Sequence, residues 1–520
     1  MQQPFATLAE AASALRAGTI GSRELVDAAL ADAGELDPLL GVYVTRFPEQ
    51  ARAAARAADA RSAAERGPLH GLPLAVKDNL ATVEGPVTAQ SRVHDRDWWR
   101  GLDAPAVARL RTAGAVVLGK TTMAEYAMGR PDPAHSFPVP RNPWDPERWT
   151  GGSSTGNGAG IAAGLFLGAL GTDTSGSVRL PAALCGTTGL KTTYGLLPTK
   201  GCVPLSPSQD VLGPMAVSAR DCALLLAALT GQPQRPAAPE EARGLRIGVP
   251  YALTDGPGIT EECRTSFRAS LRRLSELGAE IREFDFPEFG SLLAVNAVTM
   301  LAEAFAVHGG RLAADWDGHG RGFRRLTAAG AVLPAHLYLR TQYSRERLTA
   351  RLLERMDGPA GVDLIATPTW PAPARPYAQE AAPGDELNLT AVWNPTGFPA
   401  LVLPMGADPA GLPLSLQLVG RPYAENTLLG VGEAFQRATA WHLRRAAPDP
   451  RYRPTPLRDP DSAGAIEDPP VPSATSTVDS RTSHFADTLA AVGITPGPAD
   501  LAAVQAVAHA LLKAGEQPAA

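Results

Sequence analysis

The sequence predicts an α/β protein in which a single sheet is covered by helices. Short apolar runs bounded by turn residues alternate with helical patterns along the chain, which is typical of a layered α/β fold. The 520 residues are 44% hydrophobic and 19% charged, a globular composition. With 51 glycines and 48 prolines, the fold must also contain many turns.

The expected elements follow these apolar patterns in chain order. Buried strands are expected over 72–77, 115–119, 246–250, 363–367 and 400–404, and helices over 7–66, 104–113, 159–167 and 290–356. Ser22 resembles a helix start. A main domain is therefore expected over 1–456.

The C-terminal part differs in composition. Residues 457–483 are rich in Pro, Ser, Thr and Asp, which is typical of a linker. Residues 484–520 form a helical tail, with helices expected over 485–492 and 499–514. The second helix carries an apolar stripe, and a docked tail would bury three of its members: Leu501, Val504 and Leu511.

Charge and composition exclude several classes of protein. The net charge of −5 argues against a nucleic-acid binder, which needs a basic surface. No apolar run of membrane-spanning length and no signal peptide are apparent, so a cytoplasmic enzyme is expected. The four cysteines form no CxxC pair, which disfavours a disulfide framework or a zinc site.

The segment 141–181 carries the clearest chemical signal. Two serine-containing glycine loops, GGSSTGNGAG and GTDTSGS, flank a helix of small residues. Glycine lets the backbone approach a ligand closely. The N–H groups of Thr174, Ser175, Gly176 and Ser177 can form a nest that binds an oxyanion.

Two other interpretations of these loops fit less well. A dinucleotide loop at 156–160 should follow a strand, and so should a nucleophile elbow centred on Ser154. The preceding stretch NPWDPERW, with its two prolines, is a poor strand. A Ser-His-Asp triad would also need a histidine, and none stands in a telling context.

Three motifs resemble those of the amidase signature family. They are GLPLAVKDN with Lys77, GGSS with Ser153, and GTDTSGS with Ser177. Ser153 precedes Ser177 by 24 residues and follows Lys77 by 76, the spacing of the family. Flanking stretches such as VVLGKTTMAEYAMG and LPLSLQLVGRP match too, so the resemblance covers about residues 8–440.

The resemblance implies one α/β/α domain around a mixed sheet of about eleven strands. Within 1–456 it implies N-terminal helices over 7–66, a signature core over 70–230 and a helical wall of the pocket over 290–356. It also implies the catalytic roles: Ser177 as nucleophile, Ser153 as a bridging serine held by a cis peptide from Gly152, and Lys77 as base.

The residue types suit these roles. A serine hydroxyl is a weak nucleophile until a neighbouring base accepts its proton. No histidine belongs to the set, so a neutral lysine must serve, and burial favours the neutral form. Ser153 would relay the proton, and the N–H groups of 174–177 would stabilise the oxyanion. Ser175 stands where the family usually has glycine. Neither a metal nor a cofactor is implied.

The sequence-based function is a serine amidase that releases ammonia or an amine through an acyl-enzyme. Its expected substrates are small-molecule aryl or aliphatic amides, with carbamates, esters and urea-like compounds as further candidates. The expected partners exclude nucleic acid and membrane, with a homodimer as one assembly to test. The candidate substrate contacts are Met128, Trp149, Tyr338 and Trp393.

Two alternatives stay open at this point. One is the A subunit of a glutamine-dependent tRNA amidotransferase, which has the same hydrolytic chemistry but acts within a complex. The other is a binding module that has lost catalysis, which the joint presence of Lys77, Ser153 and Ser177 disfavours.

Overall fold

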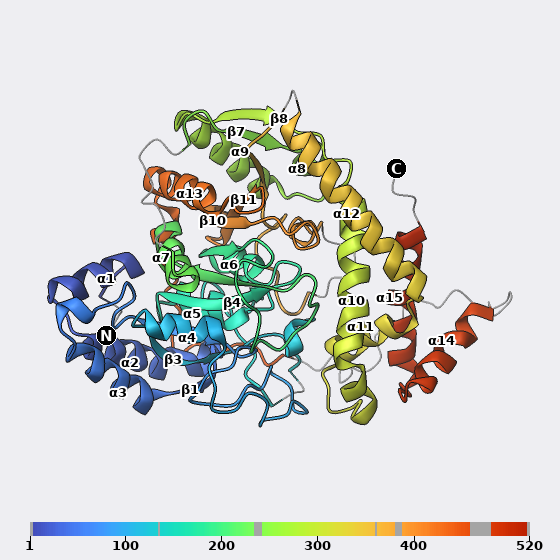
Figure 1. The fold of residues 1–520 in the computed structure, drawn as a ribbon, viewed down its shortest axis with the longest axis horizontal. Coiled ribbons are helices and arrows are strands. Elements are labelled where there is room, and N and C mark those ends of the chain that lie inside the picture. The colour runs from blue at the N-terminus through green and yellow to red at the C-terminus, as the bar shows by residue number, and fades with distance from the viewer. Residues whose placement is uncertain are drawn as a thin grey trace.

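A mixed sheet of eleven strands runs through the molecule (Figure 1). The computed structural model describes residues 4–133, 136–232, 242–358, 361–379, 387–457 and 480–516. In spatial order the strands are β1 (Tyr43–Arg46), β3 (Val116–Thr121), β2 (Pro73–Lys77), β4 (Gly168–Asp173), β6 (Val211–Ala216), β5 (Thr188–Lys191), β10 (Ala400–Ala407), β11 (Pro413–Gly420), β9 (Leu364–Pro368), β7 (Arg246–Val249) and β8 (Glu280–Glu283). The predicted fold class and strand number are confirmed.

Helices cover the sheet and extend beyond it. They are α1 (Leu8–Ala17), α2 (Ser22–Leu40), α3 (Pro48–Asp59), α4 (Pro105–Thr112), α5 (Thr155–Ala162), α6 (Arg179–Cys185), α7 (Ala219–Thr230), α8 (Tyr251–Thr254), α9 (Glu261–Glu276), α10 (Phe289–Ala314), α11 (Arg321–Ala329), α12 (Ala335–Asp357), α13 (Glu425–Thr439), α14 (Ser480–Ala491) and α15 (Pro498–Glu516). Single turns of 3₁₀ helix are η1 (Ala63–Glu65), η2 (Glu125–Ala127), η3 (Gly330–Val332), η4 (Ala391–Trp393) and η5 (Trp441–Leu443).

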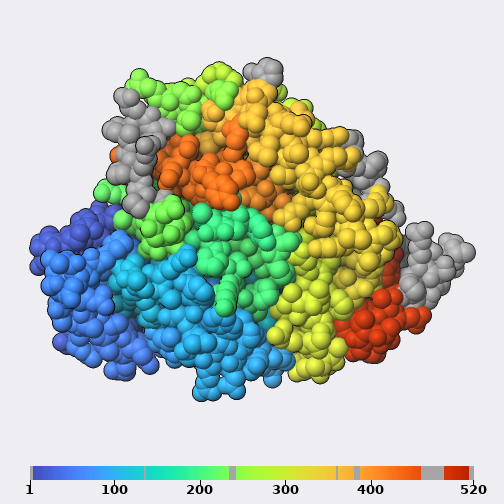
Figure 2. Space-filling model, viewed as in Figure 1, coloured from blue at the N-terminus to red at the C-terminus, as the bar shows by residue number. Residues whose placement is uncertain are grey.

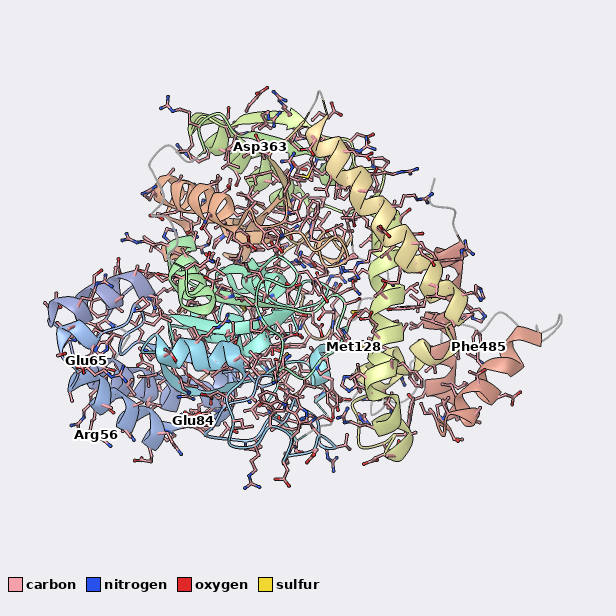
Figure 3. All side chains as sticks on the ribbon, in the orientation of Figure 1. Arg56, Glu65, Glu84, Met128, Asp363 and Phe485 are labelled. Atoms are coloured by element: carbon pink, nitrogen blue, oxygen red, sulfur yellow. The ribbon has the colours of Figure 1, made fainter. Side chains whose placement is uncertain are left out.

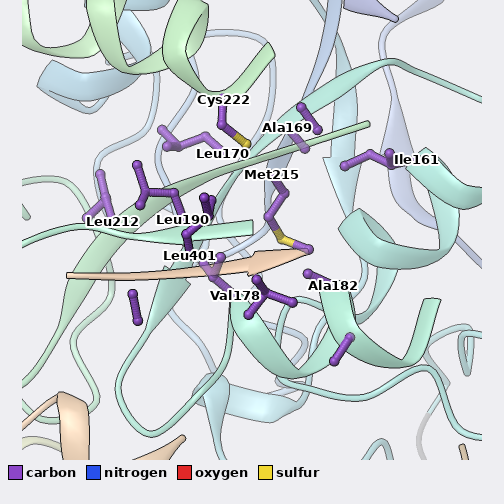
Figure 4. Close-up of a cluster of buried hydrophobic side chains, with 14 of the residues drawn as sticks. Ile161, Ala169, Leu170, Val178, Ala182, Leu190, Leu212, Met215, Cys222 and Leu401 are labelled. Carbon is purple, nitrogen blue, oxygen red and sulfur yellow. The ribbon is translucent and has the colours of Figure 1, made fainter. Parts of the chain in front are cut away.

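Strand direction brings the chemical loops together. β2 is parallel to both β3 and β4, so the carboxyl ends of β2 and β4 meet at the same edge. Apolar side chains of the central strands lie between Cys222 of α7 and Ala182 of α6 (Figure 4). Both β2 and β4 are buried along their whole length. The core therefore fixes the ends of these strands, where Lys77 and Asp173 stand.

Some local predictions were wrong. The helical region 7–66 is interrupted by strand β1, and the helix expected over 159–167 is α5, which ends at Ala162. Ser22 does not cap α2. The cap position is Gly21, and the Asp59 carboxylate accepts the N–H groups of Ser22 and Arg23 instead. A carboxylate from another helix thus replaces the local serine cap.

Helix α10 corrects the expectation that no run reaches membrane-spanning length. By length and composition it is the one helix in the described part of the chain that could cross a bilayer. The sequence analysis missed it because polar residues such as Asn296 and His308 interrupt the apolar run. In the fold α10 packs against α11, α12, α15 and η4, as a core helix does.

The C-terminal helical tail is docked on the body of the protein. Helix α15 packs against α10 and α11, and α14 packs against α15 and η3 (Figures 1 and 2). Val504 and Leu511 are buried, and Leu501 is half-buried. Phe485, labelled in Figure 3, packs edge-on against His509. Residues 458–479 of the predicted linker lie outside the described residues.

A buried carboxylate anchors the tail. Asp500, at the start of α15, accepts hydrogen bonds from Arg325 Nε at 2.6 Å and Trp316 Nε1 at 3.2 Å. It also pairs with Arg324 Nη2 at 2.8 Å. All three donors belong to α11 or the turn before it. The tail is therefore held by charge-assisted bonds as well as by apolar contact.

Removing this anchor should loosen the tail without touching the chemistry. Asp500→Ala removes an acceptor that Arg324 and Arg325 share, so we expect about 1–3 kcal/mol less stability for the docked tail. Asp487→Ala, an exposed position on α14, is the matched control and should change little. Thermal unfolding and protease sensitivity of 480–516 measure the effect. Equal melting temperatures and cleavage rates for the two variants would contradict the anchoring role.

Candidate active site

The three sequence motifs meet at one place in the structure. Lys77 is the last residue of β2, Thr172 and Asp173 end the neighbouring strand β4, and Ser153 lies just before α5. Lys77 Nζ is 2.7 Å from Ser153 Oγ. Two side chains that are 76 positions apart in the sequence therefore meet at the carboxyl end of β2.

Lys77 is fully buried, and no carboxylate of the described residues pairs with it. Its other neighbours are Thr172 Oγ1 at 2.8 Å and the Thr172 carbonyl at 3.4 Å. Burial disfavours the charged amine and lowers the pKa of Lys77 to about 7, and the more distant Asp173 and Asp210 offset this only in part. A lysine with this pKa is neutral in a large fraction of molecules at neutral pH.

The neighbours of Lys77 suit a neutral amine. A neutral amine has two N–H donors and one lone pair. Both donors find acceptors on Thr172, whose hydroxyl oxygen also accepts from Asn79 Nδ2 at 3.0 Å. The lone pair is then left for the hydroxyl proton of Ser153. This arrangement has the geometry that a base acting on Ser153 needs.

The two serines of the GGSS motif differ in environment. The Gly152–Ser153 peptide is cis, as the family resemblance implied. Ser153 contacts Lys77, whereas Ser154 Oγ donates to the Thr172 carbonyl at 3.3 Å and has no exposed surface. Ser154 N–H also donates to the Ser177 carbonyl at 3.1 Å. Ser154 therefore joins the two loops, and no strand precedes it as an elbow requires.

The Asp173 carboxylate organises the nucleophile loop. It accepts the N–H of Gly176 at 2.9 Å and of Val178 at 3.1 Å, and it pairs with Arg179 at 2.8 Å in full burial. Burial alone would raise the pKa of Asp173, but Arg179 and these N–H groups outweigh it and hold that pKa far below its usual range.

This geometry corrects one expectation. The N–H of Gly176 is used by Asp173, so it does not belong to the oxyanion nest. Within the described ranges, the N–H groups of Thr174, Ser175 and Ser177 donate no hydrogen bond, whereas that of Gly176 does. Three of the four predicted donors thus stay available for an oxyanion.

Ser177 is the most exposed of the three candidate catalytic residues. It is 8% exposed, more than Ser153 at 3% or Lys77 at 0%. Ser177 Oγ makes no hydrogen bond in the described part of the chain, so the predicted relay from Ser177 to Ser153 is not closed in this structure. Catalytic hydrogen bonds in structures without substrate are often open in this way.

The four candidate substrate contacts differ in their burial and in the residues that they contact. Trp149 lies against the cis peptide, since a Cβ on Gly152 would come within 3.5 Å of its ring. Met128 is buried and accepts a hydrogen bond from Thr327 of α11 (Figure 3). Tyr338 is half-buried and donates to Glu303 of α10.

Trp393 belongs to the core. It has no exposed surface, it stacks on Phe286 and Phe398, and its Nε1–H donates to the Leu389 carbonyl. All the surface of this ring is used by packing. We therefore withdraw Trp393 as a substrate contact.

Sequence reasoning missed two residues at the centre of the site. The hydroxyl oxygen of Thr172 accepts hydrogen bonds from the Lys77 amine and from the Asn79 side-chain amide. Both stand inside the motifs GTDTSGS and KDN, so their position was a usable signal. Their roles follow only from the pairing of β2 with β4.

The serine assignment can be tested directly. Ser153→Ala removes the hydroxyl that faces Lys77, so we expect a loss of about 10²–10⁴-fold in kcat. Ser154→Ala removes one internal hydrogen bond and should cost much less activity, with a small fall in melting temperature. Steady-state kinetics of the two variants decide the matter. A larger loss for Ser154→Ala would mean that the loops are wrongly assigned.

Comparison with known proteins gives consistent relatives. The chain is 39% identical over 476 residues to the A subunit of a glutamyl-tRNA(Gln) amidotransferase from Roseiflexus sp. (strain RS-1), covering 84% of this chain and 97% of that one. Native peptide amidase from Stenotrophomonas maltophilia superposes with a TM-score of 0.72 at 28% identity. The match covers 85% of this chain and 98% of the peptide amidase. A chain from a vestigial protein complex that reveals the evolutionary origins of an s-triazine catabolic enzyme superposes with a TM-score of 0.77 at 29% identity. The match covers 85% of this chain and 100% of that one.

These relatives overturn the expectation about partners. The curated relatives at 36–39% identity are named as subunits of an amidotransferase whose name includes a tRNA. The sequence-based expectation that a small-molecule amide is the partner, with no nucleic acid involved, is therefore wrong. It rested on net charge, which says nothing about what the other proteins of a complex bind.

The family assignment does not depend on the correction about partners. The family model described as Amidase matches residues 24–429, which include all three motifs of the site. The resemblance drawn from Lys77, Ser153 and Ser177 is confirmed by this match and by the structural neighbours. The chain belongs to the amidase signature family.

Proposed function

We propose that the chain is the hydrolytic component of a glutamine-dependent amidotransferase, with Ser177 as nucleophile, Ser153 as bridge and Lys77 as base. The observation that carries the proposal is its 39% identity to an amidotransferase A subunit, over 97% of the length of that protein. The neutral-lysine geometry supplies the chemistry. A broad amidase of the kind expected from the sequence has less support from the relatives.

The reaction has two half-steps. Ser177 Oγ attacks the carbon of a carboxamide, and its proton passes through Ser153 to Lys77. The N–H groups of Thr174, Ser175 and Ser177 stabilise the tetrahedral oxyanion. When the C–N bond breaks, the proton returns to the leaving nitrogen, which departs as ammonia and leaves an acyl ester on Ser177.

Water completes the cycle. It attacks the ester carbon while Lys77, again neutral, accepts its proton through Ser153. The ester C–O bond breaks, Ser177 regains a proton, and a carboxylate leaves. In an amidotransferase the ammonia from the first half-step passes to a partner protein, which joins it to an acyl group on tRNA.

A second candidate is an amidohydrolase that releases ammonia to water without partner proteins. One specific observation favours it. The chain carries its own helical tail, in which α15 packs on α10 and α11 and buries Val504 and Leu511. Because the tail already covers this face of α10 and α11, a separate protein cannot bind there while the tail is docked.

Ammonia release from glutamine distinguishes the two candidates. The isolated chain is assayed alone and after co-expression with candidate B and C subunits and tRNA, with Ser177→Ala as the blank. The proposal predicts glutamine hydrolysis that rises several-fold with the partners. No glutamine hydrolysis under any condition, together with rapid hydrolysis of other carboxamides by the chain alone, would reject it in favour of the second candidate.

A further inference from the structure

The loop Asp173–Ser177 has three N–H groups that make no hydrogen bond within the described residues. Their direction is set by the groups that bind the carbonyl oxygens of the preceding residues. A trans peptide is planar, so each N–H points away from the carbonyl of the preceding residue. Hydrogen bonds that hold the carbonyls of Asp173, Thr174 and Gly176 therefore also aim the N–H groups of Thr174, Ser175 and Ser177.

All three of these carbonyls are held. The donors are Asn394 Nδ2 to the Asp173 oxygen at 2.9 Å, Asn296 Nδ2 to the Thr174 oxygen at 3.2 Å, and Leu180 N–H to the Gly176 oxygen at 2.6 Å. The last donor is the local backbone of helix α6. The first two are asparagine side chains from segments more than 100 residues further along the chain.

We propose that Asn296 of α10 is a positioning residue for the oxyanion hole. By holding the Thr174 carbonyl from behind, its amide turns the N–H of Ser175 toward the carbonyl oxygen of the substrate. This rests on the proposed role of Ser177 as nucleophile. Asn296 does not touch the reacting atoms, and at 2% exposure it acts from inside the fold.

The orientation of the Asn296 amide is fixed by its surroundings. Its Nδ2 also donates to Gln209 Oε1 at 2.7 Å, and its Oδ1 accepts the hydroxyl of Ser175 at 2.8 Å. Gln209 Nε2 in turn donates to the Asn296 carbonyl at 3.3 Å. A flipped Asn296 amide would set its oxygen against two other oxygens, so the hydrogen bonds allow only one orientation.

Asn296 thus holds Ser175 from two sides, through the preceding carbonyl and through the side chain. The second contact exists because position 175 carries a hydroxyl where glycine is usual in the family. Asn394 is a poorer choice for a test, because its Oδ1 also accepts from the buried guanidinium of Arg179 at 2.7 Å. Its loss would also remove one acceptor of Arg179, the partner of Asp173 in the same loop, so its effect could not be assigned to one N–H group.

Asn296→Leu, whose side chain has the same number of heavy atoms and the same branch point, removes the amide and tests the proposal. Removing one oxyanion donor outright costs about 10²–10³-fold in kcat, so misdirecting one should cost about 10–100-fold. We expect KM within threefold and an unchanged midpoint of the acid limb of the pH profile, because the Lys77–Ser153 contact is intact. Gln342→Ala is the control: it removes a hydrogen bond from α12 to Thr299, one turn further along α10, and should leave kcat within twofold.

Gln209→Met gives an independent variant in case Asn296→Leu does not fold. It removes the support of the Asn296 amide but keeps the amide itself, so kcat should fall by less, about threefold to tenfold. The double variant should lose no more than Asn296→Leu alone, since both changes act through one contact.

The outcomes separate the two proposals. If wild-type Ser177 reacts with a fluorophosphonate and folded Asn296→Leu keeps its kcat, the positioning role is wrong. A fall that appears in KM, or with a shifted pH midpoint, also contradicts it. If wild-type Ser177 does not react at all, the proposed function fails first.

Discussion

Ser177→Ala should abolish both turnover and labelling by a fluorophosphonate. The alanine has no oxygen to attack the carboxamide, and the other serines of the two loops are engaged elsewhere: Ser153 with Lys77, Ser154 with Thr172 and Ser175 with Asn296. Serine hydrolases lose roughly 10⁶-fold in kcat on loss of the nucleophile. We expect activity at or below about 10⁻⁴ of wild type.

The control for this variant is its fold. Ser177 is small, and its hydroxyl makes no hydrogen bond within the described residues. The melting temperature should therefore stay within about one degree. Residual ammonia release above one per cent, or labelling at an unchanged rate, would show that another group is the nucleophile.

Lys77 should control the acid limb of the pH profile. Burial lowers the pKa of Lys77 to about 7, so the amine is protonated below that pH and cannot accept the proton of Ser153. We therefore expect kcat/KM to rise with pH through a midpoint near 7 and then to level off. Lys77→Ala should cost about 10³–10⁴-fold, and Lys77→Arg should not rescue it because arginine stays protonated.

Two other buried groups titrate close to this range and serve as controls. Burial lowers the pKa of Lys191 to about 7, and its amine donates to the Phe398 carbonyl at 2.6 Å. Burial raises the pKa of Asp210 to about 6, and this carboxylate accepts from the Thr174 hydroxyl. In Lys191→Met the midpoint should stay near 7, whereas Asp210→Asn removes a negative charge that raises the pKa of Lys77, so it should lower the midpoint. Loss of the acid limb in either variant would assign the limb to that group.

The sequence predicted those parts of the fold that depend on local patterns. The apolar run before Lys77 indicated a buried strand, and the stripe on 499–514 indicated a docked helix; both stand in the structure. Strand β4 was missed because GALGTD combines small residues with turn formers. Its strand character comes from pairing with β2 and β6, which no local pattern records.

The site shows the same division. The residue types and spacing of Lys77, Ser153 and Ser177 were enough to nominate them as a set. Two hydrogen bonds could not be predicted in this way, because they depend on how the loop and distant segments fold together. They join the Gly176 N–H to the Asp173 carboxylate and the Asn296 amide to the Thr174 carbonyl. Aromatic identity alone could not separate Trp149, beside the cis peptide, from Trp393 in the core.

The most direct test of the account is the site of the covalent adduct on the wild-type chain. Trypsin releases residues 149–179 as one peptide, which contains Ser153, Ser154, Ser175 and Ser177. Fragmentation of this peptide by mass spectrometry, after reaction with a fluorophosphonate or a rapid acid quench during turnover, places the adduct on a single residue. The account predicts an adduct on Ser177 alone, whereas an adduct on Ser153 or Ser154 would contradict it.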